Sequence, residues 1–247
     1  MRWIYLSPHL DDAVLSAGGL IYDQVQAGIP VEIWTFMCGY PLDGEYSMFA
    51  QVLHKIWGFS SGEEAVRGRR AEDLQAANIL GAKAVHFDFL DCIYRRGRNG
   101  EWLYSDIYLP PHEDEADLPR QIAEAASARL MPDDVLVCPL SVGSHVDHVL
   151  VRRAAELLDR PLRYDIDIPY LFYKPEELEV KAAGMKETVH PITEAGLRSW
   201  QEAILAYRSQ FPVLGERLHT PEKMRDAIRS YWEEQGGLCL FEREGRK

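Results

Sequence analysis

Two short clusters in this 247-residue chain combine residue types that bind metal ions and transfer protons. The first reads His-Leu-Asp-Asp at residues 9–12, and the second reads His-Val-Asp-His at residues 145–148. Imidazole nitrogens and carboxylate oxygens are ligands of zinc, and the same groups act as general acids and bases. The clusters lie far apart in the sequence, so only the fold can bring them together.

Each cluster follows a predicted strand and opens a predicted helix. Short apolar runs at 3–7 and 134–139 are typical of buried strands. Apolar residues spaced by three and four then predict a helix over 12–27 and another that continues the second cluster to about residue 158. Ligands of open parallel sheets bind in the crevice beyond the carboxyl ends of the strands. Both clusters are therefore expected at that edge of one sheet.

The rest of the chain alternates in the same way, which is typical of βαβ units. It predicts an α/β fold of the Rossmann-like, three-layer αβα type with a mostly parallel sheet, in a single domain over residues 1–247. Segments 39–60 and 92–111 are predicted to be long loops that form the pocket. Further strands are predicted at 31–38, 84–89, 164–171, 188–190 and, at an edge of the sheet, 236–242; further helices are predicted at 61–80, 113–130, 194–209 and 221–234.

The spacing of the two clusters is compatible with one metal site. Residues three apart at a strand-to-helix turn share a face, so His9 and Asp12 can converge with His148 on a single ion. Two imidazoles and one carboxylate leave coordination positions open, as catalytic zinc sites do. Asp11 and His145 are then left over. Hydrolysis needs such a pair, a carboxylate to accept a proton from water and an imidazole to stabilise an oxyanion or protonate the leaving group.

Both clusters also have a purely structural interpretation. Asp11 or Asp12 can cap the N-terminus of the helix that follows, because a short acceptor there satisfies free backbone N–H groups. Ser144 and Asp147 have the spacing of a capping box. The occurrence of two such His/Asp groups at one predicted sheet edge favours a functional site over two separate caps.

Charge and composition exclude several classes of partner. The chain has 27 Lys and Arg against 39 Asp and Glu, a net charge of −12. An acidic surface repels phosphate backbones, so no nucleic-acid partner is expected. No segment approaches the roughly 20 apolar residues of a membrane span, and the N-terminal apolar run is too short for a signal peptide. We expect a soluble cytoplasmic protein whose four widely spaced cysteines are reduced and structural; the sequence leaves open whether it forms a homo-oligomer.

The two clusters resemble the motifs of the PIG-L (LmbE-like) zinc-dependent de-N-acetylases, which carry A-H-P-D-D near the N-terminus and H-x-D-H about midway. Residues 69–72, Arg-Arg-Ala-Glu, resemble the family's R-x-x-E helix, which ends in Leu-Gly as at 80–81, and residues 207–210 also look familiar. The sequence departs from the family motifs at Leu10, Ala13 and Val146. None of these departures removes a ligand or a catalytic group.

The resemblance implies a role for each residue of the two clusters. It implies zinc bound by His9, Asp12 and His148. Asp11 would be the general base, and His145 would stabilise the tetrahedral intermediate, with Asp147 orienting the His145 ring. Iron, cobalt or manganese are compatible with the same ligand types.

The resemblance further implies that Arg69 reaches the substrate, with its neighbour Arg70 as the alternative. The expected reaction removes an N-acetyl group from an amino sugar or glycoconjugate. Two other functions stay open at this point. One is a different metallohydrolase such as a phosphoesterase, which usually relies on a second metal about 3.5–4 Å from the first. The other is a non-catalytic sugar-binding module that a metal ion organises.

Overall fold

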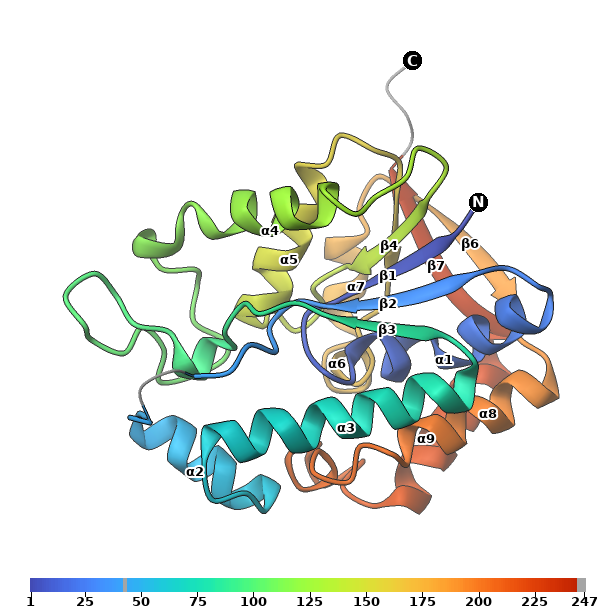
Figure 1. The fold of residues 1–247 in the computed structure, drawn as a ribbon. Helices are drawn as coiled ribbons and strands as arrows, with labels where there is room; N and C mark the ends of the chain where they lie inside the picture. Colours follow the sequence, from blue (N-terminus) through green and yellow to red (C-terminus); the bar gives the residue numbers. More distant parts are fainter. Residues whose placement is uncertain (42–43, 244–247) are drawn as a thin grey trace.

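One mixed sheet runs through the computed structural model, which describes residues 1–41 and 44–243 (Figure 1). Its strand order is β3-β2-β1-β4-β5-β7-β6. The first five strands in this order are parallel, whereas β7 is antiparallel to both β5 and β6. The strands are β1 (Trp3–Ser7), β2 (Val31–Thr35), β3 (Lys83–His86), β4 (Val135–Pro139), β5 (Leu162–Asp165), β6 (Met185–Pro191) and β7 (Gly237–Arg243).

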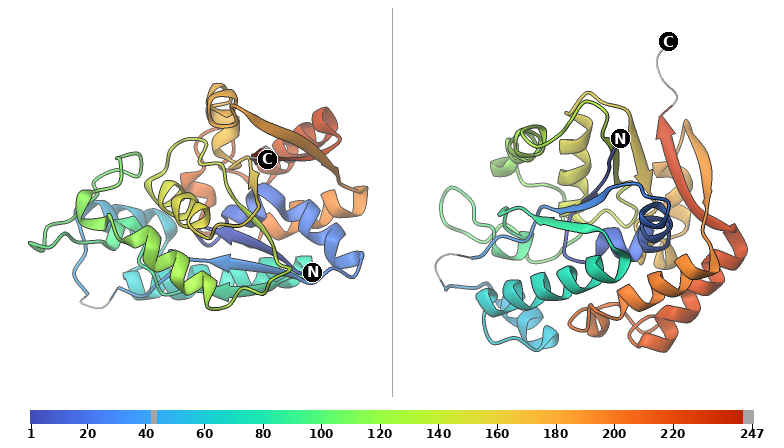
Figure 2. Two further views of the ribbon diagram at one scale, coloured as in Figure 1. Left: turned by 90° about the horizontal axis from the view of Figure 1, so that it is seen from above. Right: turned by 45° about the vertical axis from the view of Figure 1, so that its right-hand side comes forward.

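Helices cover both faces of this sheet. Figures 1 and 2 place α3, α8 and α9 on one face and α4 and α5 on the other, with α1 packed against α3 and α8. The predicted three-layer αβα fold with a mostly parallel sheet is confirmed. The helices are α1 (Asp12–Gln26), α2 (Met48–Trp57), α3 (Gly62–Leu80), α4 (Leu118–Ser127), α5 (Val146–Glu156), α6 (Tyr170–Tyr173), α7 (Glu176–Lys181), α8 (Glu194–Ile204) and α9 (Pro221–Gln235), with short 3-10 turns η1 (Cys92–Tyr94), η2 (Glu113–Glu115) and η3 (Phe211–Val213).

The strand order has a switch point between β1 and β4. From β1 the chain continues to β2 on one side, and from β4 it continues to β5 on the other side. All five residues of β1 are buried, as expected for a central strand with a helical layer on each face. The segments that follow β1 and β4 diverge above their carboxyl ends, so they leave a crevice there.

Helix α1 approaches its neighbours closely because it carries Gly18 and Gly19. A Cβ atom at Gly18 would lie 2.5 Å from Cδ1 of Trp200, a fully buried residue of α8. The indole Nε1 of Trp200 donates a hydrogen bond of 2.8 Å to the carbonyl of Val14. At Gly18 this close approach joins helices α1 and α8.

The segment 39–60 is not a long loop, because it contains helix α2. Ser47 caps its N-terminus by accepting a hydrogen bond from the Ala50 N–H, and Gly58 ends it in the left-handed conformation at φ 83°. Phe49, Leu53 and Trp57 repeat at intervals of four between these caps. Cap signals and helical periodicity were thus present in the sequence.

Three other predicted elements differ from the structure. The strand expected over 164–171 ends at Asp165, because Asp167 has a positive φ of 52° that interrupts extended pairing. The last strand, β7, lies between β5 and β6 and not at an edge. The helix expected over 113–130 begins at Leu118, next to Pro119, whose fixed φ suits the first turn of a helix. Among the described residues, no helix is both long and apolar enough to cross a membrane.

Candidate active site

The first His/Asp cluster lies where β1 gives way to α1. Asp11 stands at the N-cap position, yet within the described residues its side chain makes no capping hydrogen bond. The cap is supplied by Ser7, whose hydroxyl accepts a hydrogen bond of 3.1 Å from the Ala13 N–H. The carboxylate of Asp12 turns back to accept the His9 N–H at 2.8 Å. The interpretation of either aspartate as a helix cap is therefore wrong.

The second cluster lies at the same edge, where the loop after β4 enters α5. His145 is the N-cap residue, and its Nδ1 accepts a hydrogen bond of 3.1 Å from the N–H of Asp147. The capping box of Ser144 and Asp147 is therefore wrong, since the cap comes from the imidazole. Because Nδ1 of His145 is an acceptor, the proton of the neutral ring lies on Nε2.

Asp12 presents one carboxylate oxygen to a ring nitrogen of each of the two other predicted metal ligands. Oδ2 of Asp12 lies 3.1 Å from Nδ1 of His9 and 3.2 Å from Nε2 of His148. A tetrahedral zinc ion with bonds of about 2.0–2.1 Å holds adjacent ligand atoms about 3.3 Å apart, so these separations suit a shared ion. Nε2 of His148 is buried and, apart from this contact with Asp12, has no hydrogen-bond partner among the described residues. A bound cation would satisfy this nitrogen.

The ring nitrogens of His9 and His148 that face away from Asp12 are held by other carboxylates. Nε2 of His9 lies 2.9 Å from Oδ2 of Asp147, and Nδ1 of His148 lies 2.7 Å from Oδ1 of Asp167. Histidines that ligate metals are commonly oriented by such a carboxylate on the second nitrogen. The Asp147 carboxylate therefore positions His9. The backbone N–H of Asp147 contacts the His145 ring that Asp147 was expected to orient.

Electrostatics at this point favour a bound cation. Burial alone would lower the pKa of His9, but hydrogen bonds with Asp12 and Asp147 outweigh it and hold the pKa well above its usual range. Burial likewise opposes protonation of His148, yet Asp12 and Asp167 raise the pKa of this ring to about 10. The pKa of Asp12 is held well below its usual range because the two imidazoles outweigh its burial. The carboxylates that attract protons to these rings also attract a divalent metal.

Other combinations of the same side chains are also close enough to bind an ion. Ligand atoms lie within 4.8 Å of one another in His9, His145 and His148, and in His9, Asp91 and Asp147. The two carboxylates of the second combination already pair with arginines, because Arg95 lies 2.6 Å from Asp147 and Arg69 lies 3.7 Å from Asp91. Two nearby positive charges oppose a second cation there.

Asp11 and His145 lie beside the predicted ligands and have shifted pKa values. Burial, reinforced by the charge of Asp12, raises the pKa of Asp11 to about 7, although Arg69 opposes the shift. Burial and the positive charges of His9 and His148 hold the pKa of His145 well below its usual range. Asp11 is thus a carboxylate whose pKa suits a general base at neutral pH. His145 is a neutral imidazole that can donate a hydrogen bond from Nε2.

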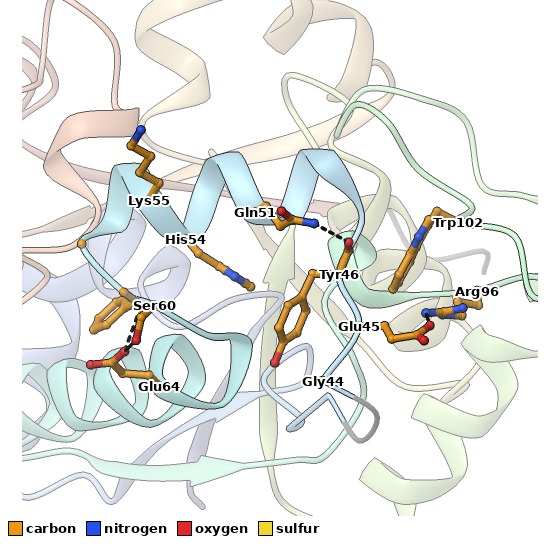
Figure 3. Close-up of a pocket in the computed structure, with 12 residues that line it drawn as sticks. Gly44, Glu45, Tyr46, Gln51, His54, Lys55, Ser60, Glu64, Arg96 and Trp102 are labelled. Carbon is orange, nitrogen blue, oxygen red and sulfur yellow. Dashed lines mark hydrogen bonds and ion pairs between the residues drawn. The ribbon is translucent and has the colours of Figure 1, made fainter.

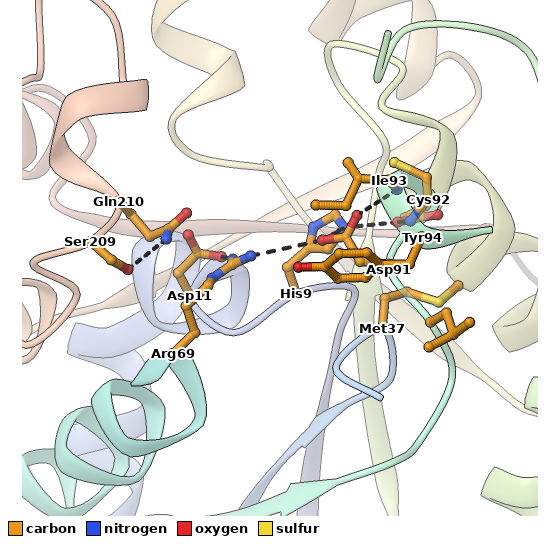
Figure 4. Close-up of polar contacts among 12 residues, drawn as sticks. His9, Asp11, Met37, Arg69, Asp91, Cys92, Ile93, Tyr94, Ser209 and Gln210 are labelled. Carbon is orange, nitrogen blue, oxygen red and sulfur yellow. Dashed lines mark hydrogen bonds and ion pairs between the residues drawn. The ribbon is translucent and has the colours of Figure 1, made fainter. Parts of the chain in front are cut away.

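The two adjacent arginines of α3 point to different surroundings. The Arg69 guanidinium lies between the carboxylates of Asp11, at 3.9 Å, and Asp91, at 3.7 Å, and lines the same cavity as they do (Figure 4). Arg70 instead donates to the carbonyl of Cys38 at 2.9 Å and binds the end of β3. The structure therefore brings Arg69 into the site and leaves Arg70 in a structural position.

A segment from the C-terminal part of the chain completes this side of the site. The carboxylate of Glu72, one helical turn after Arg69, accepts hydrogen bonds from the Ser209 N–H at 2.9 Å and the Ser209 hydroxyl at 2.6 Å. Gln210 donates to the same hydroxyl at 2.7 Å and lines the cavity (Figure 4). Glu72 thus positions the segment that carries Gln210.

The site opens into a cavity of about 600 Å³. His9, Asp11, Asp12, Arg69 and His145 line it, whereas His148 and Asp147 lie behind them. Apolar residues of α2 and η3, Tyr170 of α6 and residues of the loop that follows β3 also line it. The prediction that segments 39–60 and 92–111 form the pocket is confirmed, since residues of both line the cavity. Sequence reasoning missed Asp167, because it lies within the strand predicted over 164–171, whereas β5 ends at Asp165.

A second cavity, of about 950 Å³, lies on the other side of α2 (Figure 3). Tyr46, Gln51 and His54 line it together with Arg96 and Trp102 from the loop after β3. Among the described residues, the lining of this cavity includes no predicted site residue. The chemistry therefore belongs to the first cavity.

Comparison with known proteins identifies the family. Residues 4–158, well over half of the chain, match PIG-L, described as GlcNAc-PI de-N-acetylase. The chain belongs to the PIG-L family. This match spans both His/Asp clusters and the Arg69 helix, so the resemblance seen in the sequence is confirmed.

Individual PIG-L relatives extend the match beyond residue 158. A 2'-N-acetylparomamine deacetylase from Niallia circulans is 26% identical over 240 residues, covering 88% of this chain and 84% of the relative. The zinc-inhibited form of teicoplanin deacetylase Orf2 superimposes with a TM-score of 0.84 at 27% identity, covering 98% and 97% of the two chains. The A40926 pseudoaglycone deacetylase Dbv21 gives 0.71 at 28% identity, covering 100% and 99%.

PIG-L membership makes this chain a member of a family of hydrolytic deacetylases. The zinc-inhibited neighbour and the His/Asp group described above together favour a divalent metal at the site.

Proposed function

We propose that this PIG-L protein uses a divalent metal, zinc in the first place, to hydrolyse the N-acetyl group of an N-acetylated amino sugar or glycoconjugate. One observation carries the proposal. Oδ2 of Asp12 lies 3.1 Å from Nδ1 of His9 and 3.2 Å from Nε2 of His148, and Asp11 and His145 line the same cavity as His9 and Asp12. The named activities of the relatives, all deacetylases, support the same reaction.

His9, Asp12 and His148 would hold the metal ion. When bound, the ion supplies Lewis acidity that polarises the amide carbonyl and lowers the pKa of water toward neutrality. Asp147 and Asp167 keep the two imidazoles turned so that one nitrogen of each ring faces Asp12. Their negative charge also makes the ligands more basic.

Asp11 and His145 would carry the proton transfers. Asp11 accepts a proton from the attacking water as its oxygen bonds to the acetyl carbon, and the carbonyl oxygen becomes negative. Nε2–H of His145 donates a hydrogen bond to that oxygen. The bond between carbon and nitrogen then breaks, and the proton held by Asp11 passes to the departing nitrogen. The products are acetic acid and a free amine, which become acetate and an ammonium group at neutral pH, so atoms and charges balance.

Arg69 would orient the substrate. Its guanidinium is buried between Asp11 and Asp91 and faces the cavity that contains the reacting groups. A planar group with several N–H donors suits the hydroxyl and carbonyl oxygens of an acylated sugar. Arg69 also opposes the rise in the Asp11 pKa and so favours the basic form of that carboxylate.

The test combines metal content with acetate release. Purified protein is analysed for bound metals and then assayed on methyl 2-acetamido-2-deoxyglucoside, a simple N-acetylated sugar. We expect one metal ion per chain and release of acetate. Asp11→Asn should keep the metal but lower kcat by about 10²–10⁴-fold, since a general base contributes on that order.

Two outcomes would contradict this proposal. Near-normal turnover by Asp11→Asn would remove Asp11 as the base. Two metal ions per chain, with phosphate released from a phosphate ester and no acetate released from N-acetylated sugars, would indicate a phosphoesterase instead.

A further inference from the structure

The guanidinium of Arg69 is buried beside the reacting groups without a short polar contact to them. Arg69 is 7% exposed, and its ion pairs with Asp11 and Asp91 measure 3.9 Å and 3.7 Å. Hydrogen bonds from N–H groups to oxygen are about 2.7–3.2 Å long, so neither carboxylate fixes the direction of the guanidinium. Nε of Arg69 has no hydrogen-bond partner among the described residues. The orientation of this side chain therefore depends on another contact.

That contact is the indole ring of Trp57, the last residue of α2. Cζ of Arg69 lies 4.7 Å from the centre of the ring, which is a cation–π distance. Tryptophan attracts a cation more strongly than the other aromatic residues do, and the attraction increases where water is excluded. The ring face does not need an oxygen acceptor on Arg69. It can therefore hold the guanidinium while N–H groups remain for an oxygen of the substrate.

Two glycines of α3 let α2 approach closely enough for this contact. A Cβ atom at Gly62 would lie 2.6 Å from Cε1 of Tyr46, and a Cβ atom at Gly68 would lie 2.5 Å from Cε1 of Phe59. Tyr46 precedes α2 and Phe59 follows it, so both ends of α2 pack tightly on α3. The ring at the end of α2 is thereby brought over the arginine that follows Gly68.

The aromatic face is the property that distinguishes Trp57 from a simple apolar residue at this place. Its indole Nε1 is buried and has no hydrogen-bond partner within the described part of the chain. A buried donor without a partner destabilises the folded state, whereas a leucine would fill apolar space without this cost. The ring therefore contributes something that apolar volume alone does not, and the contact with Arg69 provides it.

We infer that Trp57 is a positioning residue, whose ring face holds the Arg69 guanidinium toward the cavity and leaves its N–H groups free to bind an oxygen of the substrate. This inference rests on the proposed deacetylation, in which Arg69 orients the acylated sugar. Because Trp57 acts through Arg69, loss of the ring should weaken substrate binding and leave the metal ligands in place.

The first test removes the aromatic face or keeps it. Trp57→Leu should raise KM for methyl 2-acetamido-2-deoxyglucoside by about tenfold, with kcat changed less than about threefold, since a desolvated cation–π contact contributes on that order. Trp57→Phe keeps an aromatic ring, so its KM should stay within about threefold of the parent protein. Metal content should be unchanged in both variants. An equal rise in KM in both variants, or no rise in Trp57→Leu, would overturn the inference.

A double-mutant cycle with Arg69→Ala shows whether Trp57 acts through the arginine. Addition of Trp57→Leu to Arg69→Ala should then lower kcat/KM by less than about twofold further. A further loss as large as that in the parent protein would mean that Trp57 contacts the substrate itself or supports the fold, and would overturn the positioning role.

Trp102→Leu is the matched control. Trp102 also lies over an arginine, with Cζ of Arg96 3.9 Å from the centre of its ring, but among the described residues it lines the second cavity and not that of the active site. The control should leave KM for the sugar unchanged. The same rise in KM in Trp102→Leu and Trp57→Leu would overturn the assignment to Trp57.

A measurement without substrate separates this inference from the proposed function. Protons over an aromatic face are shielded in nuclear magnetic resonance spectra. The side-chain N–H signals of Arg69, identified by their loss in Arg69→Ala, should move downfield in Trp57→Leu and stay in place in Trp57→Phe. Such movement without acetate release from any N-acetylated sugar would support the hold on Arg69 and reject the deacetylase. Signals that do not move, together with acetate release, would do the reverse.

Discussion

The cavity at the candidate active site has two sides that are built in different ways. We call them the floor, which carries the His/Asp groups that follow β1 and β4, and the apolar wall, which carries the apolar residues of α2 and η3. On the floor, His9, Asp12 and His148 are buried and tied to one another and to carboxylates at 2.7–3.2 Å. On the wall, side chains such as Ile56 are held by packing alone and stay partly exposed. The floor derives from the ends of two central strands, whereas the wall derives from a helix outside the sheet. The groups proposed to react are thus positioned by the sheet, whereas the wall is positioned by the packing of a peripheral helix.

The largest effect is expected on the floor, from His148→Ala. This change removes a proposed ligand and leaves Asp12 and Asp167 without the imidazole between them. We expect metal content and acetate release to fall together to background. Elemental analysis and the acetate assay check this, with His219→Ala, an exposed histidine far along the chain, as the control that should change neither. Full activity with metal retained would show that the ion, if present, binds elsewhere.

A smaller effect on the floor is expected from His145→Ala. Loss of one oxyanion donor typically lowers kcat by about 10²–10³-fold, and this variant should keep its metal because the ligand atoms of His9, Asp12 and His148 stay in place. Metal analysis of the variant decides between the two roles open to this ring. A loss of metal equal to that of His148→Ala would make His145 a ligand in the group that it forms with His9 and His148.

The sequence predicted the floor better than the wall for a physical reason. His9 and Asp12 follow the end of β1 directly, and His148 lies in the first turn of the helix that follows β4. The parallel sheet brings such segments to one edge regardless of distant packing. Their convergence could therefore be expected from strand patterns alone. The direction of the Asp147 carboxylate could not, because it depends on how the loop with Cys92 and Arg95 closes over the site.

Segment 39–60 was expected to line the pocket, but the helix within it was not predicted. Helix α2 lies in a segment interrupted by glycines and proline, and its apolar face packs on the distant η3 turn as well as on the cavity. Local periodicity can indicate a helix of this length but not which surface it will cover. Asp167 shows the same limit, since its contact with His148 requires the left-handed turn that ends β5.

An intermediate effect should come from the support behind the floor. Asp167→Asn keeps the shape of the side chain but removes the negative charge that lies beside Nδ1 of His148. We therefore expect metal affinity to weaken by about 10–100-fold. Competition with a chelator measures this directly and does not depend on turnover. Asp134→Asn removes a carboxylate at the opposite end of β4, where it binds Arg2, and is the matched control. Equal metal affinities in the two variants would refute a positioning role for Asp167.

The smallest effect is expected for folding stability at the wall. Because Ile56 is 42% exposed, Ile56→Asn should change the free energy of unfolding by less than about 0.5 kcal/mol. The same substitution at Ile228, a fully buried residue of α9, should cost about 3 kcal/mol or more, since it leaves a cavity and an unpaired amide. Denaturant unfolding of both variants measures the contrast. A cost at Ile56 as large as that at Ile228 would mean that the wall supports the fold.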